Sequence, residues 1–223
     1  MAVAGHRKDA AAARRGLTSV DARVRELALG ALARAGALDE AAVLAALADP
    51  VPAVRRRGAD LAARLPASEP LVAALRQALA DADPLVVEAA CWSLGEQGEA
   101  GGAVATLSGI ARLHVDARAR EAALAALAAI GDPAGLEAVL DALGDRPTVR
   151  RRAVVALAAF DGPEVDEALR AAAADRDWQV REVAEILLED PSADPGPGPD
   201  GDSPDGDSPD GDHPDGDGPA GAP

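Results

Sequence analysis

Aromatic residues are almost absent from this chain of 223 residues, which has two Trp, one Phe and no Tyr. Its core therefore has to be built from aliphatic side chains. Alanine is abundant instead, with 57 residues, and it favours helices while burying too little surface to hold strands together. We therefore exclude an all-β fold and expect a helical protein.

Cysteine is equally scarce, since Cys91 is the only one in the sequence. A single cysteine cannot form an intramolecular disulfide, which excludes a disulfide-stapled secreted scaffold and favours a reducing compartment. No apolar run reaches the length of about 18 residues that a membrane span needs. Residues 1–16 also lack the apolar centre of a signal peptide. We expect a cytoplasmic protein without a membrane span.

Positive charge is in the minority, and the formal net charge is -16. The excess is concentrated in residues 190–223, which contain ten Asp and no Lys or Arg, whereas residues 1–189 carry 22 basic and 28 acidic side chains. Neither part has the positive field that non-specific binding to nucleic acid requires. We therefore do not expect nucleic acid as a partner.

An apolar pattern occurs six times along residues 5–189. Each repeat has an apolar residue at what we call the anchor position, and successive anchors lie 30, 32, 33, 30 and 31 residues apart. Small or apolar residues recur 4, 7, 8 and 11 positions after the anchor, which places them on one face of a helix. The anchors are Val24, Val54, Val86, Ala119, Val149 and Val180.

Start and stop signals flank these six helices. An Asp three residues before the anchor can cap a helix N-terminus, and a Gly can end a helix. The expected caps are Asp21, Asp83, Asp116 and Asp177, and the expected stops are Gly36, Gly98, Gly131 and Gly162. Shorter amphipathic runs predict a preceding helix in each repeat, over residues 5–15, 39–48, 70–80, 101–112, 133–143 and 163–174.

Two short helices cannot bury their apolar stripes alone, but stacked pairs form one continuous core. We predict an all-α fold, a right-handed α-solenoid of about six helix-turn-helix repeats over residues 1–189. Residues 190–223 are rich in Pro, Gly and Asp, with a five-residue repeat that begins at Pro199. Because Pro and Gly break helices and like charges repel, we expect this acidic tail to be disordered.

The helix-pair period and the order of Asp-Pro, Val-Arg, Ala-Leu and Gly resemble the HEAT repeat family, particularly the short HEAT-like repeats also seen in phycobilin lyases. The resemblance is clearest over residues 83–98 and 149–159 and covers about residues 5–189. It implies an α-solenoid that acts as an interaction scaffold. Lyases and nucleic-acid enzymes are less common members.

The resemblance also implies a ladder between repeats, formed by an Asp and an Arg that lie six residues apart. Asp49 with Arg55 and Asp175 with Arg181 match this spacing. Elsewhere one member is missing, so we expect a broken ladder: the acid is replaced by Ser19, His114 or Gly144, and Asp81 faces Val87.

No catalytic or metal-binding constellation is evident. The three histidines, His6, His114 and His213, lie in different regions and offer no paired metal-ligand spacing. We expect no metal and no cofactor. Cys91 lies inside a predicted helix without a nearby His, so we interpret it as a small core residue and not as a nucleophile. The Asp-Gly-Asp runs of the tail do not match an EF-hand loop.

Trp92 is the main candidate for a binding residue. It lies six residues after its anchor, at an angle that points away from the core stripe towards the concave surface. A rigid amphipathic ring there suits partner binding, whereas the alternative is that Trp92 fills a flank between unequal repeats. Trp178 follows Asp177 at a helix start, and we interpret it as a cap over the last repeat.

Two arginine triplets, residues 55–57 and 150–152, occupy the same place in their repeats. They could form a patch for phosphate or an acidic peptide, or they could be solvated helix faces and ladder partners. The middle position of the triplet is acidic in the other repeats, so the charge alternates in sign and favours the second interpretation. These acidic residues are Glu26, Glu88, Glu121 and Glu182.

We predict a monomeric, non-enzymatic scaffold that binds a segment of an unknown protein partner on the concave face of the solenoid. The predicted protein-binding residues are Trp92, Val155, Ile186, Arg56, Asp60, Glu88, Glu121 and Arg151. A HEAT-like lyase or other enzyme is one alternative, marked by a deep pocket with a carboxylate of perturbed pKa. A nucleic-acid or DNA-repair binding protein is another, and it requires a continuous basic groove.

Overall fold

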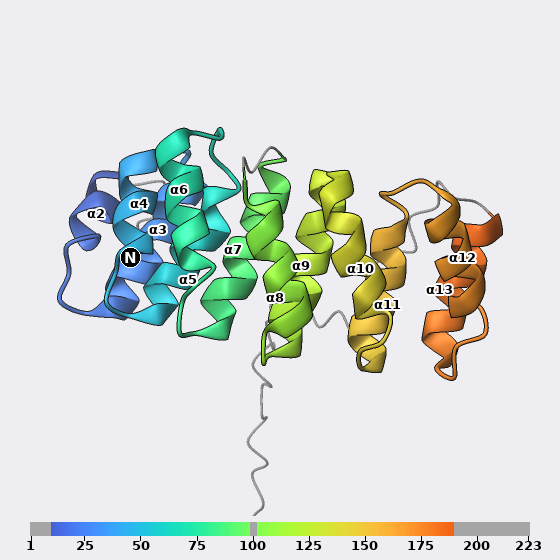
Figure 1. Ribbon diagram of the computed structural model, residues 1–223. Coiled ribbons are helices and arrows are strands. Elements are labelled where there is room, and N and C mark those ends of the chain that lie inside the picture. The colour runs from blue at the N-terminus through green and yellow to red at the C-terminus, as the bar shows by residue number, and fades with distance from the viewer. Residues whose placement is uncertain (1–9, 99–101, 190–223) are drawn as a thin grey trace, which may run out of the picture.

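The computed structural model describes residues 10–98 and 102–189, which contain twelve α-helices, one short 3-10 helix and no strand. Consecutive helices form six pairs, and the pairs stack in chain order from α2 and α3 at one end to α12 and α13 at the other (Figure 1). This architecture confirms the predicted right-handed α-solenoid. Residues 190–223, for which we expect a disordered tail, lie outside the described residues.

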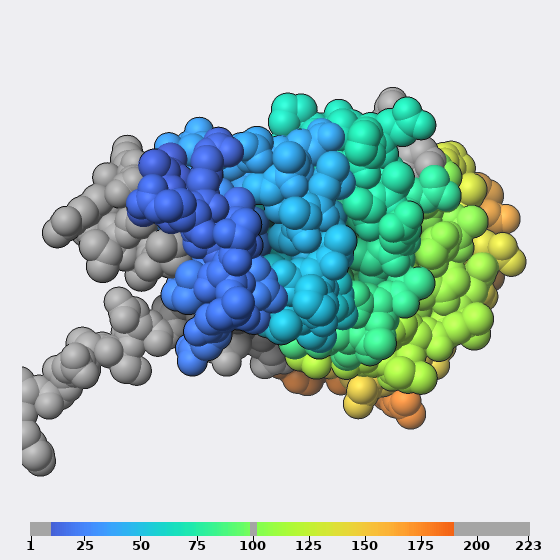
Figure 2. Space-filling model, turned by 90° about the vertical axis from the view of Figure 1, so that its left-hand side faces the viewer, coloured from blue at the N-terminus to red at the C-terminus, as the bar shows by residue number. Residues whose placement is uncertain are grey.

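The helices form two rows, and Figure 2 views the stack from its N-terminal end, with the first helix pairs nearest the viewer. The first row contains α2 (Ala10–Gly16), α4 (Glu40–Leu47), α6 (Glu69–Ala78), α8 (Val104–Leu113), α10 (Leu136–Ala142) and α12 (Pro163–Ala172). The second row contains α3 (Ala22–Ala35), α5 (Pro52–Ala62), α7 (Pro84–Glu96), α9 (Ala117–Ile130), α11 (Pro147–Leu157) and α13 (Trp178–Glu189). Each second-row helix packs against the next one.

The predicted N-terminal caps are all present. The carboxylates of Asp21, Asp83 and Asp116 each accept a hydrogen bond from the main-chain N–H two residues later, at 2.9 Å. Asp177 accepts the corresponding bond from Gln179 at 3.0 Å. These bonds satisfy N–H groups that have no partner within the helix, which fixes where four of the second-row helices begin.

Three of the four predicted stops follow helices, and the fourth prediction is wrong. Gly36 and Gly131 end α3 and α9 in the left-handed conformation with φ of 67°, and Gly98 (φ 70°) comes shortly after α7. Helix α11 already ends at Leu157, because successive turn hydrogen bonds fold Phe160 back into the core. Gly162 instead precedes α12 as its N-cap residue.

The first-row helices are shorter than their amphipathic runs. In the fifth pair, residues Pro133–Gly135 form the 3-10 helix η1 before α10 begins. Asp132 accepts the N–H of Ala134 there, so this turn is capped separately from the α-helix that follows it. In the first pair, α2 covers residues 10–16, and residues 5–9 of the predicted helix lie outside the described range.

Small residues let the two rows approach closely. Alanine lies four residues after the anchor in five repeats and is fully buried in each of them, at positions 28, 90, 123, 153 and 184. In the remaining repeat this position is Gly58, where an added Cβ would come within 2.9 Å of the Ala46 side chain. The abundance of alanine is therefore explained by close helix packing.

Arginines one residue after the anchor link neighbouring repeats. In each link, Nε and Nη2 of the arginine donate to the two carboxylate oxygens of an aspartate in the next repeat, at 2.6–3.0 Å. Such bidentate pairs are directional and strong. The pairs are Arg25–Asp49, Arg55–Asp81, Arg120–Asp145 and Arg150–Asp175.

This ladder is more complete than the sequence indicated, because residues six apart meet through the main chain. Nη1 of Arg55 donates to the carbonyl of Asp49 at 3.0 Å, while the Asp49 carboxylate binds the arginine of the preceding repeat. Arg25 uses the carbonyl of Ser19 in the same way, so no acid is needed there. Next to Gly144, Asp145 supplies the missing carboxylate.

One junction in the stack lacks the bridge, namely that between α7 and α9. Val87 replaces the arginine there and is buried, and His114 replaces the aspartate. Nδ1 of His114 accepts the N–H of Asp116 at 3.1 Å, which is the loop contact that Asp49, Asp81 and Asp175 make in their repeats. Both members of the charged pair are therefore replaced together, and neither leaves an unpaired charge.

None of the helices in residues 10–98 and 102–189 combines the length and apolar composition that crossing a membrane requires.

Candidate functional site

A cavity of about 670 Å³ opens on the second-row helices, in the middle of the stack. We call it the central cavity. Most of its lining comes from α5, α7 and α9, with one arginine from α11. The lining residues are Arg56, Arg57, Asp60, Leu85, Glu88, Ala89, Trp92, Gly95, Glu96, Arg118, Glu121, Ala122, Ala125, Ala126, Ala129 and Arg152.

Small residues make the floor of the central cavity. Helices α7 and α9 approach so closely that a Cβ added to Gly95 would lie 3.1 Å from the Cα of Ala126. This is the junction where Val87 replaces the ladder arginine. On α9, four of the six residues that line the cavity are alanines, which occupy little of the space between the helices. The central cavity therefore results from the small residues where α7 and α9 meet.

Trp92 forms an apolar wall of the central cavity. Trp92 is 47% exposed, although its helix α7 packs between α5 and α9. The position six residues after the anchor is angled away from the core, so the ring is held by its helix but not buried by it. A half-exposed indole next to an alanine floor offers a large apolar contact at little cost in side-chain entropy.

Two half-buried carboxylates lie next to Trp92 in the lining. Burial raises the pKa of Asp60, against the opposing effect of Arg56 and Arg57. Burial also raises the pKa of Glu88, against the opposing effect of Arg118. Neither carboxylate forms a hydrogen bond or an ion pair with any residue that the structure describes. They retain capacity to accept hydrogen bonds from a bound molecule.

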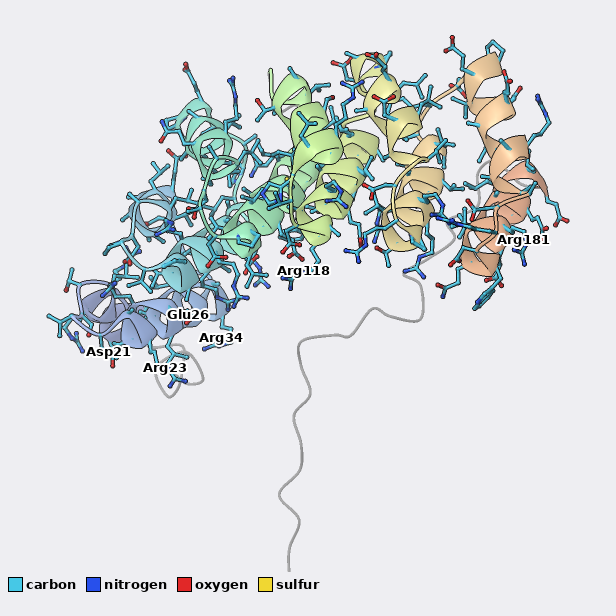
Figure 3. All side chains as sticks on the ribbon, turned by 60° about the horizontal axis from the view of Figure 1, so that its bottom comes forward. Asp21, Arg23, Glu26, Arg34, Arg118 and Arg181 are labelled. Atoms are coloured by element: carbon cyan, nitrogen blue, oxygen red, sulfur yellow. The ribbon has the colours of Figure 1, made fainter. Side chains whose placement is uncertain are left out.

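Charges of both signs surround the central cavity, with four arginines and four acidic residues in its lining. Arg118 lies on the same edge of the stack as Glu26 and Arg34 of α3, and Figure 3 labels all three. Arg118 contacts Asp116 at 3.4 Å, and Glu121 accepts a hydrogen bond from Thr148 at 2.6 Å. The alternation in sign expected from the sequence is therefore present, and the site is not a basic groove.

The structure brings together five of the eight predicted binding residues, since Trp92, Arg56, Asp60, Glu88 and Glu121 all line the central cavity. The other three do not line it. Arg151 and Val155 belong to α11, which is separated from α7 by α9, and Ile186 belongs to α13 beyond it. Val155 and Ile186 therefore do not lie beside Trp92.

Four further charged residues line the central cavity that were not predicted from the sequence to bind, namely Arg57, Glu96, Arg118 and Arg152. Arg57 and Arg152 are the third members of the arginine triplets, which gave a signal without showing which member would face the cavity. Arg118 precedes its anchor by one residue. Only the packing of α9 against α7 shows that this position faces the hollow.

Cys91 is fully buried, and burial raises the pKa of its thiol to about 12. A protonated, inaccessible thiol is a poor nucleophile, which agrees with its interpretation as a core residue. In residues 10–98 and 102–189, no group of three His, Cys, Asp or Glu side chains is arranged to hold a metal ion. His6 and His213 lie outside this range.

The stacked helix pairs and the ladder between them define an α-helical repeat protein. A family model of HEAT repeats matches residues 40–128 and 104–189. The chain belongs to the HEAT repeat family. Among curated proteins, no sequence matches it.

Several solved structures have a similar fold. The Escherichia coli protein YibA is 21% identical with a TM-score of 0.62, over 80% of this chain and 69% of that one. A designed armadillo repeat protein in complex with the peptide (KR)4 is 20% identical with a TM-score of 0.59, over 80% and 97%. The complex of CpcE and CpcF of phycocyanin lyase from Nostoc sp. PCC7120 gives 26% identity and a TM-score of 0.58, over 78% and 74%.

Proposed function

We propose that this protein is a non-enzymatic scaffold that binds a segment of a partner protein in the central cavity. The observation that carries the proposal is the half-exposed Trp92 above an alanine floor, surrounded by charges of both signs. A few aromatic and arginine side chains that become desolvated on binding supply much of the energy of protein interfaces. A rim of mixed charge adds orientation and specificity.

Each part of the cavity has a role in this proposal. Trp92 is the main apolar contact, and the alanine floor admits the main chain or a small side chain of the partner. Asp60 and Glu88 accept hydrogen bonds from the segment, since no described residue donates to them. Arg56 and Glu121 form part of the polar rim. The central position in the stack lets a segment contact three successive repeats.

Two of the similar structures support the proposal by analogy. One repeat protein binds a peptide, and the CpcE–CpcF pair is a complex of two proteins. The likeness to the designed armadillo protein is one of fold alone, so the argument for this chain depends on its own cavity.

The test compares the wild type with Trp92→Ala and with a matched control, Trp178→Ala. The two tryptophans are 47% and 59% exposed, but only Trp92 lines the central cavity. Partners captured from the native host by the wild type and the control should be lost with Trp92→Ala. For a captured segment made as a peptide, we expect at least about 30-fold weaker binding by Trp92→Ala, which corresponds to about 2 kcal/mol. Equal binding by all three proteins would refute the proposal.

An enzyme of the lyase type is a second candidate, because the central cavity holds two carboxylates with raised pKa. The cavity is open and lacks a reactive thiol, which favours the scaffold. An assay of chromophore lyase activity on phycocyanin separates the two. Activity that disappears in Glu88→Gln while the fold is retained would favour the enzyme, and the scaffold proposal predicts no activity in the wild type.

A further inference from the structure

Helix α13 closes the C-terminal end of the described stack, and one of its faces has no described helix packed against it (Figure 1). Four residues lie on this face, at spacings of three, four and three residues, which align on one side of a helix. They are Trp178, Arg181, Glu185 and Leu188. We call this stripe the end face.

The internal repeats show that this is the side normally covered by the next helix pair. Leu188 lies eight residues after its anchor and is 41% exposed, whereas the five equivalent residues are at most 1% exposed. The equivalents of Glu185 are also apolar and buried in all five preceding repeats. The end face is therefore a repeat interface without its usual cover.

Arg181 occupies the ladder position, and it is labelled at the C-terminal end of the stack in Figure 3. Its Nη1 donates to the carbonyl of Asp175 at 2.8 Å, as the other ladder arginines do to their own loops. Its Nε and Nη2 have no hydrogen-bond partner among the described residues. In four other repeats this fork binds both oxygens of a carboxylate.

The end face is self-complementary. Along α13 the order is apolar, basic, acidic, apolar, so a copy that runs in the opposite direction presents apolar, acidic, basic, apolar. A two-fold axis at the level of Val183 places each Arg181 opposite Glu185 of the other copy. The same axis places each Trp178 opposite Leu188 of the other copy. This is the layer pairing of an antiparallel helix pair.

We propose that two copies of this chain associate through their end faces, with the two α13 helices antiparallel about a two-fold axis. Two ion pairs between Arg181 and Glu185 fix the register, and two contacts between Trp178 and Leu188 bury apolar surface. A two-fold interface uses the same patch on both copies, so it closes at a dimer and does not extend into a filament. The proposed dimer differs from the monomer predicted from the sequence.

The association should be weak. Helix α13 has 12 residues and is about 18 Å long, so two such helices form an interface at the small end of the range. Each copy also continues into residues 190–223, whose ten aspartates repel those of the other copy. We expect dimers at concentrations of tens of micromolar and above, with a dissociation constant in the micromolar range.

The test is a charge-swap series on the full chain, followed by sedimentation equilibrium from about 5 to 500 µM protein at physiological ionic strength, a range that spans the affinity of a small interface. Arg181→Glu places two acids opposite each other, and Glu185→Arg places two bases opposite each other. Each single variant should dimerise at least tenfold more weakly than the wild type. An equimolar mixture of the two variants should form a heterodimer, because both contacts again pair opposite charges.

Two controls separate this interpretation from others. Glu185→Arg makes the net charge less negative, so a weaker dimer cannot result from overall repulsion. Glu69→Arg makes the same change on α6 and should leave dimerisation unchanged. Arg181→Glu also loses the bond to Asp175, but the double variant Arg181→Glu/Glu185→Arg should recover the dimer. Circular dichroism of every variant should show that helicity is retained.

Several results would overturn the proposal. A wild type that stays monomeric throughout the concentration range would refute it. This includes the case in which another segment of the chain covers Trp178 and prevents dimerisation. Dimerisation of both single variants at the wild-type level would also refute it, as would a mixture that gains no heterodimer. The scaffold proposal is independent, since Trp92→Ala should dimerise normally and Trp178→Ala should still bind the partner.

Discussion

The contribution of the Arg–Asp ladder to the free energy of unfolding can be tested with residues that the protein itself uses. At the junction between α7 and α9, Val87 and His114 replace the charged pair. Arg150 and Asp175 form a bidentate pair whose side chains are 5% and 16% exposed. Replacing Arg150 by Val leaves the Asp175 carboxylate without its arginine and the Asp145 carbonyl without the Nη1 donor. Removing one partner of a buried pair costs about 3–5 kcal/mol. We expect about 2–4 kcal/mol, because Asp175 keeps some exposure and the N–H of Asp177.

The double variant Arg150→Val/Asp175→His reproduces the pair found naturally at Val87 and His114. A neutral histidine can accept the loop N–H through Nδ1, as His114 does at 3.1 Å, and no charge remains unpaired. Replacing both members of a buried ion pair is often nearly neutral. We therefore expect the double variant to lie within about 1 kcal/mol of the wild type, with a coupling energy of about 2 kcal/mol.

The assay is urea unfolding at pH 7.5 of the wild type, the two single variants and the double variant, followed by circular dichroism. Arg170→Val is the control, since Arg170 and Asp166 form an exposed pair at 3.9 Å on α12. This change should cost less than about 0.5 kcal/mol. The reasoning is refuted if Arg150→Val costs less than about 1 kcal/mol, or if the two single changes add without coupling.

Three further predictions follow from the same packing. Leu94→Asp places a charge where the native side chain is fully buried, so far-ultraviolet circular dichroism should show loss of at least the central repeats, and full helicity would contradict the assigned register. Hydrogen bonds from arginine lower the pKa of Asp49, Asp81 and Asp175, so urea midpoints should stay level down to about pH 4 and fall below it. In a variant without Trp178, Trp92 should show red-shifted, readily quenched fluorescence, because its ring is half-exposed. Trp92→Ala should lower the free energy of unfolding by less than the about 3–5 kcal/mol that truncating a buried aromatic costs. Blue-shifted fluorescence would mean that the ring is covered.

The sequence alone determined the architecture. A hydrophobic period near 31 residues, with caps such as Asp21 and stops such as Gly36, is local information that a helix pair encodes regardless of its neighbours. Stacking follows because such pairs cannot bury their apolar faces alone. The outward angle of Trp92 follows from the same helical period. Predictions failed where tertiary contacts override a local signal, as at Gly162, where burial of Phe160 ends α11 earlier.

Only the tertiary structure decided which outward residues share a site and which remain open. Arg118 and Arg152 join Trp92 at the central cavity, while Val155 does not, although Arg152 and Val155 both belong to α11. Which residues of a helix reach the cavity depends on how the neighbouring repeats stack. The ladder likewise joins each arginine to the next repeat, about 25 residues away, and no spacing within one repeat reveals that partner. Contacts between repeats require the stacked geometry, whereas those within a repeat are already present in the sequence.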